Sequence, residues 1–390
     1  MSHNKTFCIL PWMHLATTST GKYRPCCNIA QGTTVTKDDG SHFNVWEDSI
    51  EAMWDSSYMQ QLRAKMLAGK KSRVCKRCYR EEDSGIESAR QSANSRYMFN
   101  YDAVINPPVN IKYLDLRLGN LCNLKCRMCN PYASSMWTKE WNLIADKDKQ
   151  LSDTQLKYLK NMTWPDDPFF WDQIDKHSIE IDEIYLTGGE PTLITKQYEL
   201  YNSLIAKGLA HKIKLKYNTN LTNIPDKLVD YWRYFKQVKL NASIDAYGDL
   251  DRYIRYPSSW KKIDENLKKF IAMGNIKIEV HCTVQIYNIL RLNELFDYLE
   301  PLKLPVYLNI LNHPEELNIR VLPEHLKDQA ALYLEKHYDL VIRKKDKIAD
   351  YMYKEDWSHL LPKFKNYTDT LDKSREESIY NLIEEFRHVA

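Results

Sequence analysis

The sequence predicts an α/β fold organised around an open, partial (β/α)6 barrel. First, apolar and β-prone segments alternate with helix-like segments from residue 110 onwards, a pattern typical of parallel βαβ units. Second, six such units are too few for a closed eight-stranded barrel. Third, a separate set of cysteines precedes these units, and a charged, helix-like stretch follows them. We therefore expect three domains, at residues 1–105, 106–314 and 315–390, the last a helical extension.

The elements of the barrel follow from local composition. Strands are expected where β-prone apolar residues cluster, at 111–118, 181–186, 211–218, 238–245, 276–284 and 305–311. Helices are expected at 132–145, 195–207, 225–235, 260–273 and 290–300. Residues 146–180 are polar and read as an insertion with one or two short helices. Because parallel barrels place their chemistry at the carboxyl ends of the strands, the candidate site lies in the segments that follow them.

The N-terminal region begins with a predicted hairpin. Residues 16–27 turn at Gly21, which would bring Cys8 near Cys26. A helix is then expected from Ile50 to Ala68.

Gly69 fits the C-cap of this helix, and a CxxC pair, Cys75 and Cys78, follows it. Together with the cysteines of the hairpin, these thiolates suit a tetrahedral centre. Spacing alone does not distinguish zinc from iron–sulfur here.

Three further cysteines lie on a short segment after the first barrel strand. The segment LGNLCNLKCRMCNP (118–131) spaces Cys122, Cys126 and Cys129 as CxxxCxxC. A structural zinc ion normally takes four ligands, whereas three local thiolates on a four-iron cluster would leave one iron open. The alternative is a zinc knuckle or a set of buried structural cysteines.

This spacing resembles the signature of the radical S-adenosylmethionine (SAM) superfamily, with Met128 in place of the usual aromatic residue before the third cysteine. The resemblance implies a 4Fe–4S cluster on Cys122, Cys126 and Cys129 that binds SAM at its open iron. The segment LTGGEPTL (186–193) matches the family's GGEP stretch, in which Gly188, Gly189 and Glu190 would hold the methionine amino group. On its own that segment is also compatible with a tight turn carrying a solvated glutamate.

Other strand-end residues would complete the SAM site. Asn218 and Ser243 place short polar groups where a ribose could be hydrogen-bonded. Strand-end capping explains Asn218 equally well and Ser243 less well. The SID stretch and a DxxR element resemble those of peptide-modifying members, and Arg255 would bind the methionine carboxylate. Many arginines on such helices are only solvated. Cys282 fits a small buried residue better than a hydrogen-atom donor.

The N-terminal pattern, FCxxPW, GxxxPCC and CxxCYxxE, resembles the auxiliary-cluster module called SPASM or twitch. That module usually follows the radical SAM core, whereas here it precedes the core. The resemblance implies a second 4Fe–4S cluster, with the ligands Cys8, Cys26, Cys75 and Cys78. Because adjacent strand residues point to opposite faces, Cys26 and Cys27 should not both bind it; Cys26 is the expected ligand.

Composition limits the partners. The net charge of +3 gives no indication of a nucleic-acid or membrane partner. No apolar run approaches the ~20 residues that span a bilayer. The N-terminus does not read as a signal peptide. We therefore expect a cytoplasmic protein, in which the nine cysteines are metal ligands rather than disulfide partners.

The resemblance implies an activity: reductive cleavage of SAM to a 5′-deoxyadenosyl radical that abstracts a hydrogen atom from a peptide or protein. The electron would come from a flavodoxin or ferredoxin. One alternative is a dehydrogenase or epimerase acting on a small molecule such as a sugar or nucleoside. A more remote one is a non-catalytic zinc-binding interaction protein. The substrate, and whether SAM is consumed or regenerated, stay open at this point.

Overall fold

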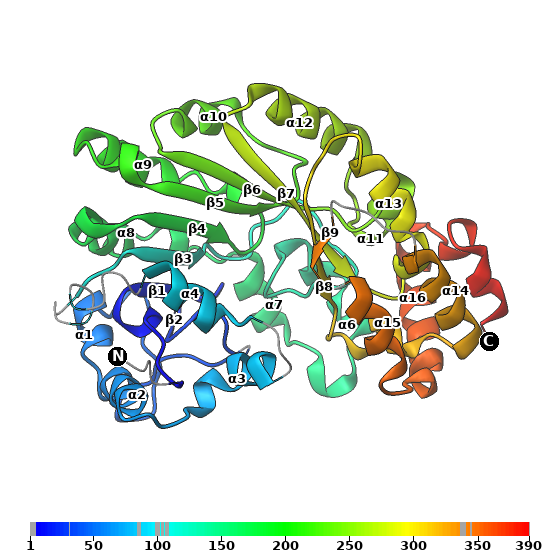
Figure 1. Ribbon diagram of the computed structural model, residues 1–390, viewed down its shortest axis with the longest axis horizontal. Coiled ribbons are helices and arrows are strands. Elements are labelled where there is room, and N and C mark those ends of the chain that lie inside the picture. Colours follow the sequence, from blue (N-terminus) through cyan, green and yellow to red (C-terminus); the bar gives the residue numbers. More distant parts are fainter. Residues whose placement is uncertain are drawn as a thin grey trace. The chain divides into compact units, whose positions relative to one another are not determined.

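Strands and helices alternate along the chain in the computed structural model, which describes residues 5–30, 32–83, 87–97, 102, 105, 109–335, 341–343 and 345–389 (Figure 1). The chain forms two units. The first comprises Met1–Leu121, Met162–Tyr217 and Asp226–Val238; the second comprises Cys122–Asn161, Asn218–Pro225 and Lys239–Ala390. The predicted boundaries at 105/106 and 314/315 stay predictions.

The first unit is built on a mostly parallel sheet. Its strands are β1 (His14–Thr17), β2 (Tyr23–Arg24), β3 (Tyr113–Arg117), β4 (Glu183–Thr187) and β5 (Lys214–Thr219), whose last residues pass into the second unit. They lie in the order β2-β1-β3-β4-β5, and only β1 and β2 pair antiparallel. Leu114, Ile184 and Leu215 lie side by side in register and are fully buried, as expected for a parallel sheet covered on both faces.

The predicted hairpin is confirmed, and it joins the sheet in a way that the sequence did not indicate. Gly21 has a φ of +69°, and an added Cβ there would lie 2.5 Å from the Trp46 ring, so this turn requires glycine. His14 of β1 pairs in parallel with Tyr113 of β3. The N-terminal segment therefore extends the sheet that the first predicted barrel strand begins.

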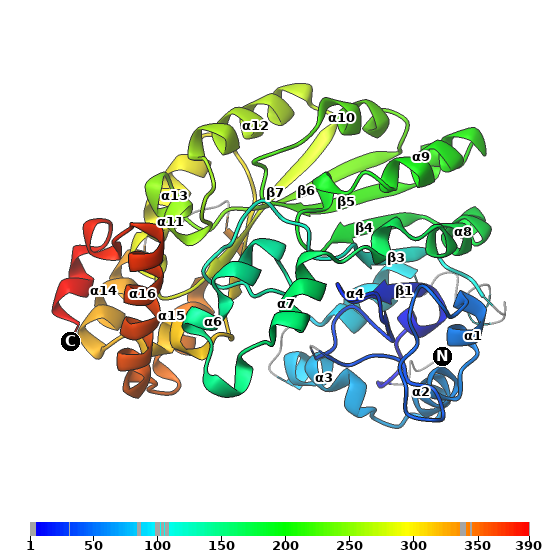
Figure 2. The same cartoon turned by 180° about the vertical axis from the view of Figure 1, so that it is seen from behind.

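Helices flank these strands. They are α1 (Ile50–Trp54), α2 (Ser57–Leu67), α3 (Lys76–Asp83), α4 (Ala89–Tyr97), α8 (Pro168–Lys176), α9 (Gln197–Ala206) and α10 (Asp226–Trp232), with short 3-10 helices η1 (Leu10–Trp12), η2 (Arg73–Cys75), η6 (Trp164–Asp166), η7 (Ser178–Glu180), η8 (Pro191–Leu193) and η9 (Ala210–Lys212). Both ribbon views show α8 and α9 running alongside β4 and β5 (Figures 1 and 2).

One predicted helix of this unit is wrong in its continuity. The helix expected from Ile50 to Ala68 breaks into α1 and α2, because Ser56 takes an extended conformation and its side chain accepts a hydrogen bond from the Met59 N–H. A serine that caps a new helix in this way ends the one before it. Gly69 follows α2 with a φ of +72°, as expected near a helix C-terminus.

The second unit carries β7 (Ile276–Val284), β8 (Val306–Ile310), β9 (Val341–Arg343) and residues 239–243 of β6 (Gln237–Ser243); β7, β8 and β9 pair in parallel. All six predicted barrel strands are therefore present, as β3 to β8, and the mostly parallel α/β fold is confirmed. β9 corrects the expectation of an all-helical C-terminal region. Val341 and Arg343 of β9 pair with β8. A segment this short gives no local sequence signal for a strand.

The helices of the second unit are α6 (Trp141–Ile144), α7 (Asp153–Lys160), α11 (Asp249–Ile254), α12 (Trp260–Met273), α13 (Leu292–Leu299), α14 (Glu324–Glu335), α15 (Lys345–Tyr353) and α16 (Leu361–Arg375). Its 3-10 helices are η4 (Ser135–Lys139), η5 (Lys147–Lys149), η10 (Ile289–Arg291), η11 (Glu315–Leu317), η12 (Ile319–Val321), η13 (Ser358–Leu360), η14 (Ile379–Asn381) and η15 (Glu384–His388). Among the described residues, no helix has the length and apolar character to cross a bilayer.

The helix predicted at 132–145 is also wrong: the segment forms only η4 and α6. The Ser134 hydroxyl accepts the Met136 N–H and donates to the Leu124 carbonyl, which delays the helix start. The Trp137 ring is fully buried and its Nε1–H donates to the Cys126 carbonyl, 2.9 Å away. Contacts with the cysteine segment thus override the local helical preference.

Candidate metal and cofactor sites

The four cysteines predicted as auxiliary ligands line one cavity in the first unit. Cys26 comes from the end of the hairpin, and Cys8 precedes η1. Cys75 ends η2, and Cys78 lies on α3. The cavity has about 390 Å³ of empty space, part of it open to solvent. Its other lining residues are Leu10, Pro11, Pro25, Asn28, Ile29, Leu62, Met66, Val74 and Arg90. We call it the four-thiol cavity.

The donors in this cavity suit a metal cluster. Burial raises the pKa of Cys8 well above its usual range, and burial with the neighbouring Cys78 raises the pKa of Cys75 to about 11. These thiols therefore keep their protons until a metal replaces them. Asn28 donates from Nδ2 to Cys78 Sγ and from its backbone N–H to Cys26 Sγ, both at 3.4 Å, so two donors already address the sulfurs.

Cys27 is not among the residues that line the four-thiol cavity. Its thiol lies beside His14 and Asp115 instead. The Cys27 thiol also contacts that of Cys26, because Cys27 lies in a turn after β2 rather than on an extended strand.

The CxxxCxxC segment (residues 118–131, the cysteine loop) gathers its thiols in the second unit. The Cys129 N–H donates to the Cys126 carbonyl at 2.9 Å, which closes a tight turn. The Cys129 thiol lies against Cys126, and this contact lowers the pKa of Cys126 while raising that of Cys129. Cys122 also raises the pKa of Cys129 by electrostatic repulsion, so all three sulfurs interact. Three converging soft donors fit an iron–sulfur cluster.

The cysteine loop is pinned by the backbone that ends α11. The Lys125 N–H donates to the Tyr256 carbonyl at 2.6 Å, and the Arg127 N–H donates to the Ile254 carbonyl at 2.8 Å. These bonds fix the loop on both sides of Cys126.

A buried arginine between two of the cysteines ties the loop to the C-terminal helices. Arg127 is fully buried, stacks 3.5 Å above the Tyr253 ring and pairs with Asp372 at 2.6 Å and with Glu377 at 3.2 Å. Sequence reasoning missed this role. The only local signal was an arginine inside the CxxC, whose partners lie about 250 residues further on.

The GGEP turn follows β4 in the first unit and packs against backbone. An added Cβ at Gly188 would lie 2.9 Å from the Gly119 carbonyl, and one at Gly189 would lie 2.2 Å from the Leu121 carbonyl. Glu190 is 1% exposed rather than solvated; its N–H donates to the Leu121 carbonyl at 2.7 Å, and its carboxylate accepts a bond from the Thr192 hydroxyl at 2.8 Å. The glycines therefore let the turn pack directly against the backbone of residues 117–121, where a side chain would collide.

Asn218 and Ser243 lie at strand ends and belong to the second unit. Asn218 Oδ1 accepts a bond from Asn241 Nδ2 at 2.8 Å, and the Asn241 side-chain oxygen is buried without a hydrogen-bond donor among the described residues. Ser243 is half-buried, while Ala242 and Ile244 on either side are fully buried. Hydroxyl groups of a ribose would satisfy such an unpaired acceptor.

Arg255 follows α11 in the second unit and already has an anionic neighbour. Its Nη2 lies 2.8 Å from Asp245 Oδ2, and both side chains are buried. Its positive charge also acts on the Cys126 thiol, whose pKa it helps to lower. Cys282 is fully buried next to the Asp245 carbonyl, and burial raises its thiol pKa well above the usual range.

Asp251, on α11, makes stability depend on pH. Burial raises its pKa to about 7, while its carboxylate accepts the backbone N–H of Asp245 at 2.9 Å. The folded state therefore binds this proton more tightly than the unfolded chain does. Its contribution to stability falls as pH rises from about 4 to about 7 and is constant above that.

We expect Asp251→Asn to remove this pH dependence. Between about pH 5.5 and pH 7.5 the wild-type protein should lose on the order of 1–2 kcal/mol relative to the variant. Anaerobic thermal unfolding at both pH values measures it. Asp249→Asn, which alters an exposed carboxyl on the same helix, should keep the wild-type slope. Equal slopes for wild type and Asp251→Asn would contradict the assignment.

Comparisons with known proteins identify two domains. Residues 116–295 match the Radical SAM superfamily, and residues 8–79 match the SPASM iron–sulfur cluster-binding domain. No curated protein matches the chain.

Solved structures are only distantly similar. Streptococcus suis SuiB bound to S-adenosylmethionine shares 13% identity over 71% of this chain and 63% of that chain, with a TM-score of 0.36. Native anSMEcpe with bound AdoMet shares 15% identity over 60% of this chain and 59% of that chain, with a TM-score of 0.37. The chain thus spans about three fifths of the length of each, and similarity at this level carries no argument about function. The domain matches do carry such an argument: residues 116–295 form a radical SAM domain and residues 8–79 form a SPASM domain that precedes it, a combination that implies SAM and two 4Fe–4S clusters as cofactors.

Proposed function

We propose that this protein is a radical SAM enzyme that abstracts a hydrogen atom from a peptide or protein and so modifies it oxidatively. The observation that carries the proposal is the convergence of two cysteine sets, three thiols on the cysteine loop and four around one cavity, in a chain that matches both domains. The assignment to a peptide substrate is supported by the resemblance of Ser243, Asp245 and Arg255 to the SID and DxxR elements of peptide-modifying members.

Cys122, Cys126 and Cys129 would hold the SAM-binding cluster, which when reduced would supply the one electron needed to cleave SAM. The protein's part is to bind, orient and exclude water. Gly188 and Gly189 let the turn lie against the backbone that precedes Cys122, and with Glu190 they would hold the methionine amino group.

Polar groups at the strand ends would bind the rest of SAM. Asn218, Asn241 and Ser243 would take the ribose hydroxyls. Arg255 would offer its guanidinium to the methionine carboxylate. Because Asp245 already faces that guanidinium, the ion pair would have to be shared with the carboxylate or exchanged for it.

Cys8, Cys26, Cys75 and Cys78 would hold the auxiliary cluster. Four protein ligands leave no coordination position for a substrate, which favours a role in electron transfer over one in substrate binding. The proposed reductant is a flavodoxin or ferredoxin, and the proposed location is the cytoplasm.

Isotope transfer tests the substrate class. Anaerobically reconstituted, reduced protein is incubated with SAM and either deuterated peptides or deuterated sugars and nucleosides. We expect deuterium in 5′-deoxyadenosine only with peptides. Label from the small molecules alone would establish the alternative substrate class, and no deoxyadenosine formation with any substrate would overturn the proposed activity.

A further inference from the structure

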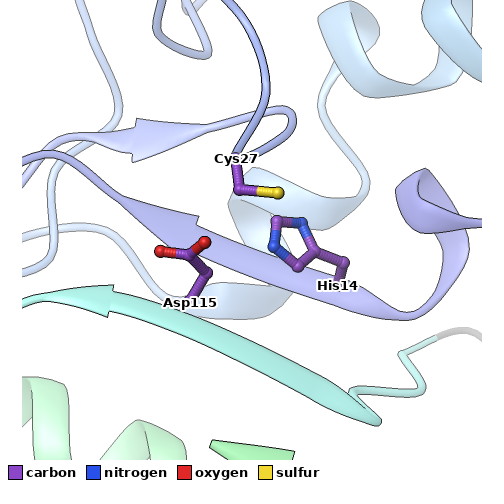
Figure 3. Close-up of side chains that lie close together, drawn as sticks. All are labelled: His14, Cys27 and Asp115. Atoms are coloured by element: carbon purple, nitrogen blue, oxygen red, sulfur yellow. The ribbon is translucent and has the colours of Figure 1, made fainter. Parts of the chain in front are cut away.

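A second group of metal-binding side chains lies in the first unit, apart from the residues assigned above. His14 lies on β1, Asp115 lies on β3, and Cys27 follows β2. Figure 3 shows the imidazole, the thiol and the carboxylate pointing toward one another. One ligand atom from each side chain lies within 4.8 Å of those of the other two.

The Cys27 thiol lies against the His14 imidazole, but it does not meet a ring nitrogen in good hydrogen-bond geometry. The His14 side chain is 3% exposed, and neither ring nitrogen has a hydrogen-bond partner of ordinary geometry among the described residues. The ring packs against Tyr113, with centroids 4.8 Å apart, so one of its faces is held by an aromatic contact. Leaving polar nitrogens buried and unpaired is costly. A bound ligand that meets a nitrogen would remove that cost.

The chemistry of the donors selects the ligand. Magnesium and calcium prefer oxygen ligands, so an imidazole and a thiolate argue against both. Zinc accepts nitrogen, sulfur and oxygen at about 2.0–2.3 Å in tetrahedral geometry, which separates its ligands by about 3.5 Å. The ligand atoms lie within 4.8 Å of one another, so they would have to approach each other by about 1 Å to bind zinc.

The charges nearby are compatible with a divalent cation. Arg117, Arg24 and Lys216 act electrostatically on Asp115, and all three would repel a metal ion. The Cys27 thiolate and the Asp115 carboxylate supply two negative charges, which neutralise the ion. Arg24 is fixed beside this group by its own bonds: its Nη2 donates to the Ile29 carbonyl at 2.9 Å, and its Nη1 donates to the Cys27 carbonyl at 3.4 Å.

We propose that His14, Cys27 and Asp115 form a mononuclear zinc site distinct from the two iron–sulfur clusters. Three protein ligands leave the fourth tetrahedral position for water or for a donor group of another molecule. The site explains why the chain has two adjacent cysteines: Cys26 faces the four-thiol cavity and Cys27 faces the zinc. It does not depend on the identity of the substrate.

The test uses the full chain with both clusters reconstituted, equilibrated with Zn²⁺ and then freed of excess metal. Metal analysis should find about one zinc beside about eight irons per chain. X-ray absorption at the zinc edge should show one sulfur at about 2.3 Å and nitrogen or oxygen ligands at about 2.0 Å. His14→Ala and Asp115→Asn should lose the zinc and keep the irons. His42→Ala is the matched control, because His42 lies in the same unit and is bonded to the Thr34 hydroxyl instead.

Cys27→Ala separates zinc binding from cluster binding. Loss of zinc with the full iron content supports the site, whereas loss of about four irons would make Cys27 a cluster ligand and overturn it. Wild-type protein that retains no zinc, or zinc retained by all three ligand variants, would overturn it as well. Asp115→Asn keeps the shape of the side chain, so it carries the test if His14→Ala does not fold.

Discussion

Replacing Cys126 with alanine is expected to abolish cleavage of SAM and to halve the iron content, from about eight to about four irons per chain. Cys126 is buried at the centre of the cysteine loop, and its thiol contacts that of Cys129. Three thiolates already leave one iron of the cluster without a protein ligand. The two thiolates that remain in the variant would therefore not hold a four-iron cluster. Anaerobic iron and sulfide analysis, together with deoxyadenosine formation after reduction, measures both effects.

Cys282→Ala is the matched control for this variant. Cys282 is also a buried thiol of the second unit, but it lies on β7 and contacts the Asp245 carbonyl rather than another cysteine. This variant should keep about eight irons and cleave SAM at close to the wild-type rate. If Cys126→Ala kept its full iron content and its SAM cleavage, the proposed role of the cysteine loop would be wrong.

The parts of the fold that the sequence predicts well are those with a strong local period. The six barrel strands have runs of β-prone apolar residues, and α12 presents Ile263, Leu267 and Phe270 to the core at helical spacing. Ser259 and Gly274 mark its two ends, so its bounds match the prediction at both. The cysteine sets were equally visible, because their spacing is short and the chemistry of thiols is specific.

The features that the sequence does not reveal depend on contacts between distant segments. The pairing of β1 with β3 joins strands about 100 residues apart, and no local period encodes it. The same pairing brings His14 near Asp115, so the proposed zinc site could not be read from spacing. The ion pairs of Arg127 with Asp372 and Glu377 are of the same kind. The remaining errors are in the predicted bounds of two helices. They arise because Ser56 and Ser134 make local hydrogen bonds that start a new helix or delay one.

The GGEP turn gives the second large expected effect. Replacing Gly189 with alanine should destabilise the protein by about 3–5 kcal/mol and weaken SAM binding. The φ of +54° disfavours a side chain, and the new Cβ would lie 2.2 Å from the Leu121 carbonyl and 2.8 Å from the Asn120 carbonyl carbon. Those atoms are backbone, and Leu121 directly precedes Cys122, so the collision cannot be relieved by turning a side chain.

Gly208→Ala is the control that separates the effect of the steric collision from the effect of a positive φ. Gly208 also has a positive φ, +68°, but no atom lies within 4 Å of its added Cβ. This variant should cost only about 1–2 kcal/mol, the ordinary penalty for a left-handed residue. Anaerobic thermal unfolding gives the stabilities, and the change that SAM causes in the spectrum of the reduced cluster reports binding. Because both glycines lie in the first unit, equal losses in the two variants would mean that the backbone around Leu121 yields to a methyl group, and that close packing does not require glycine at position 189.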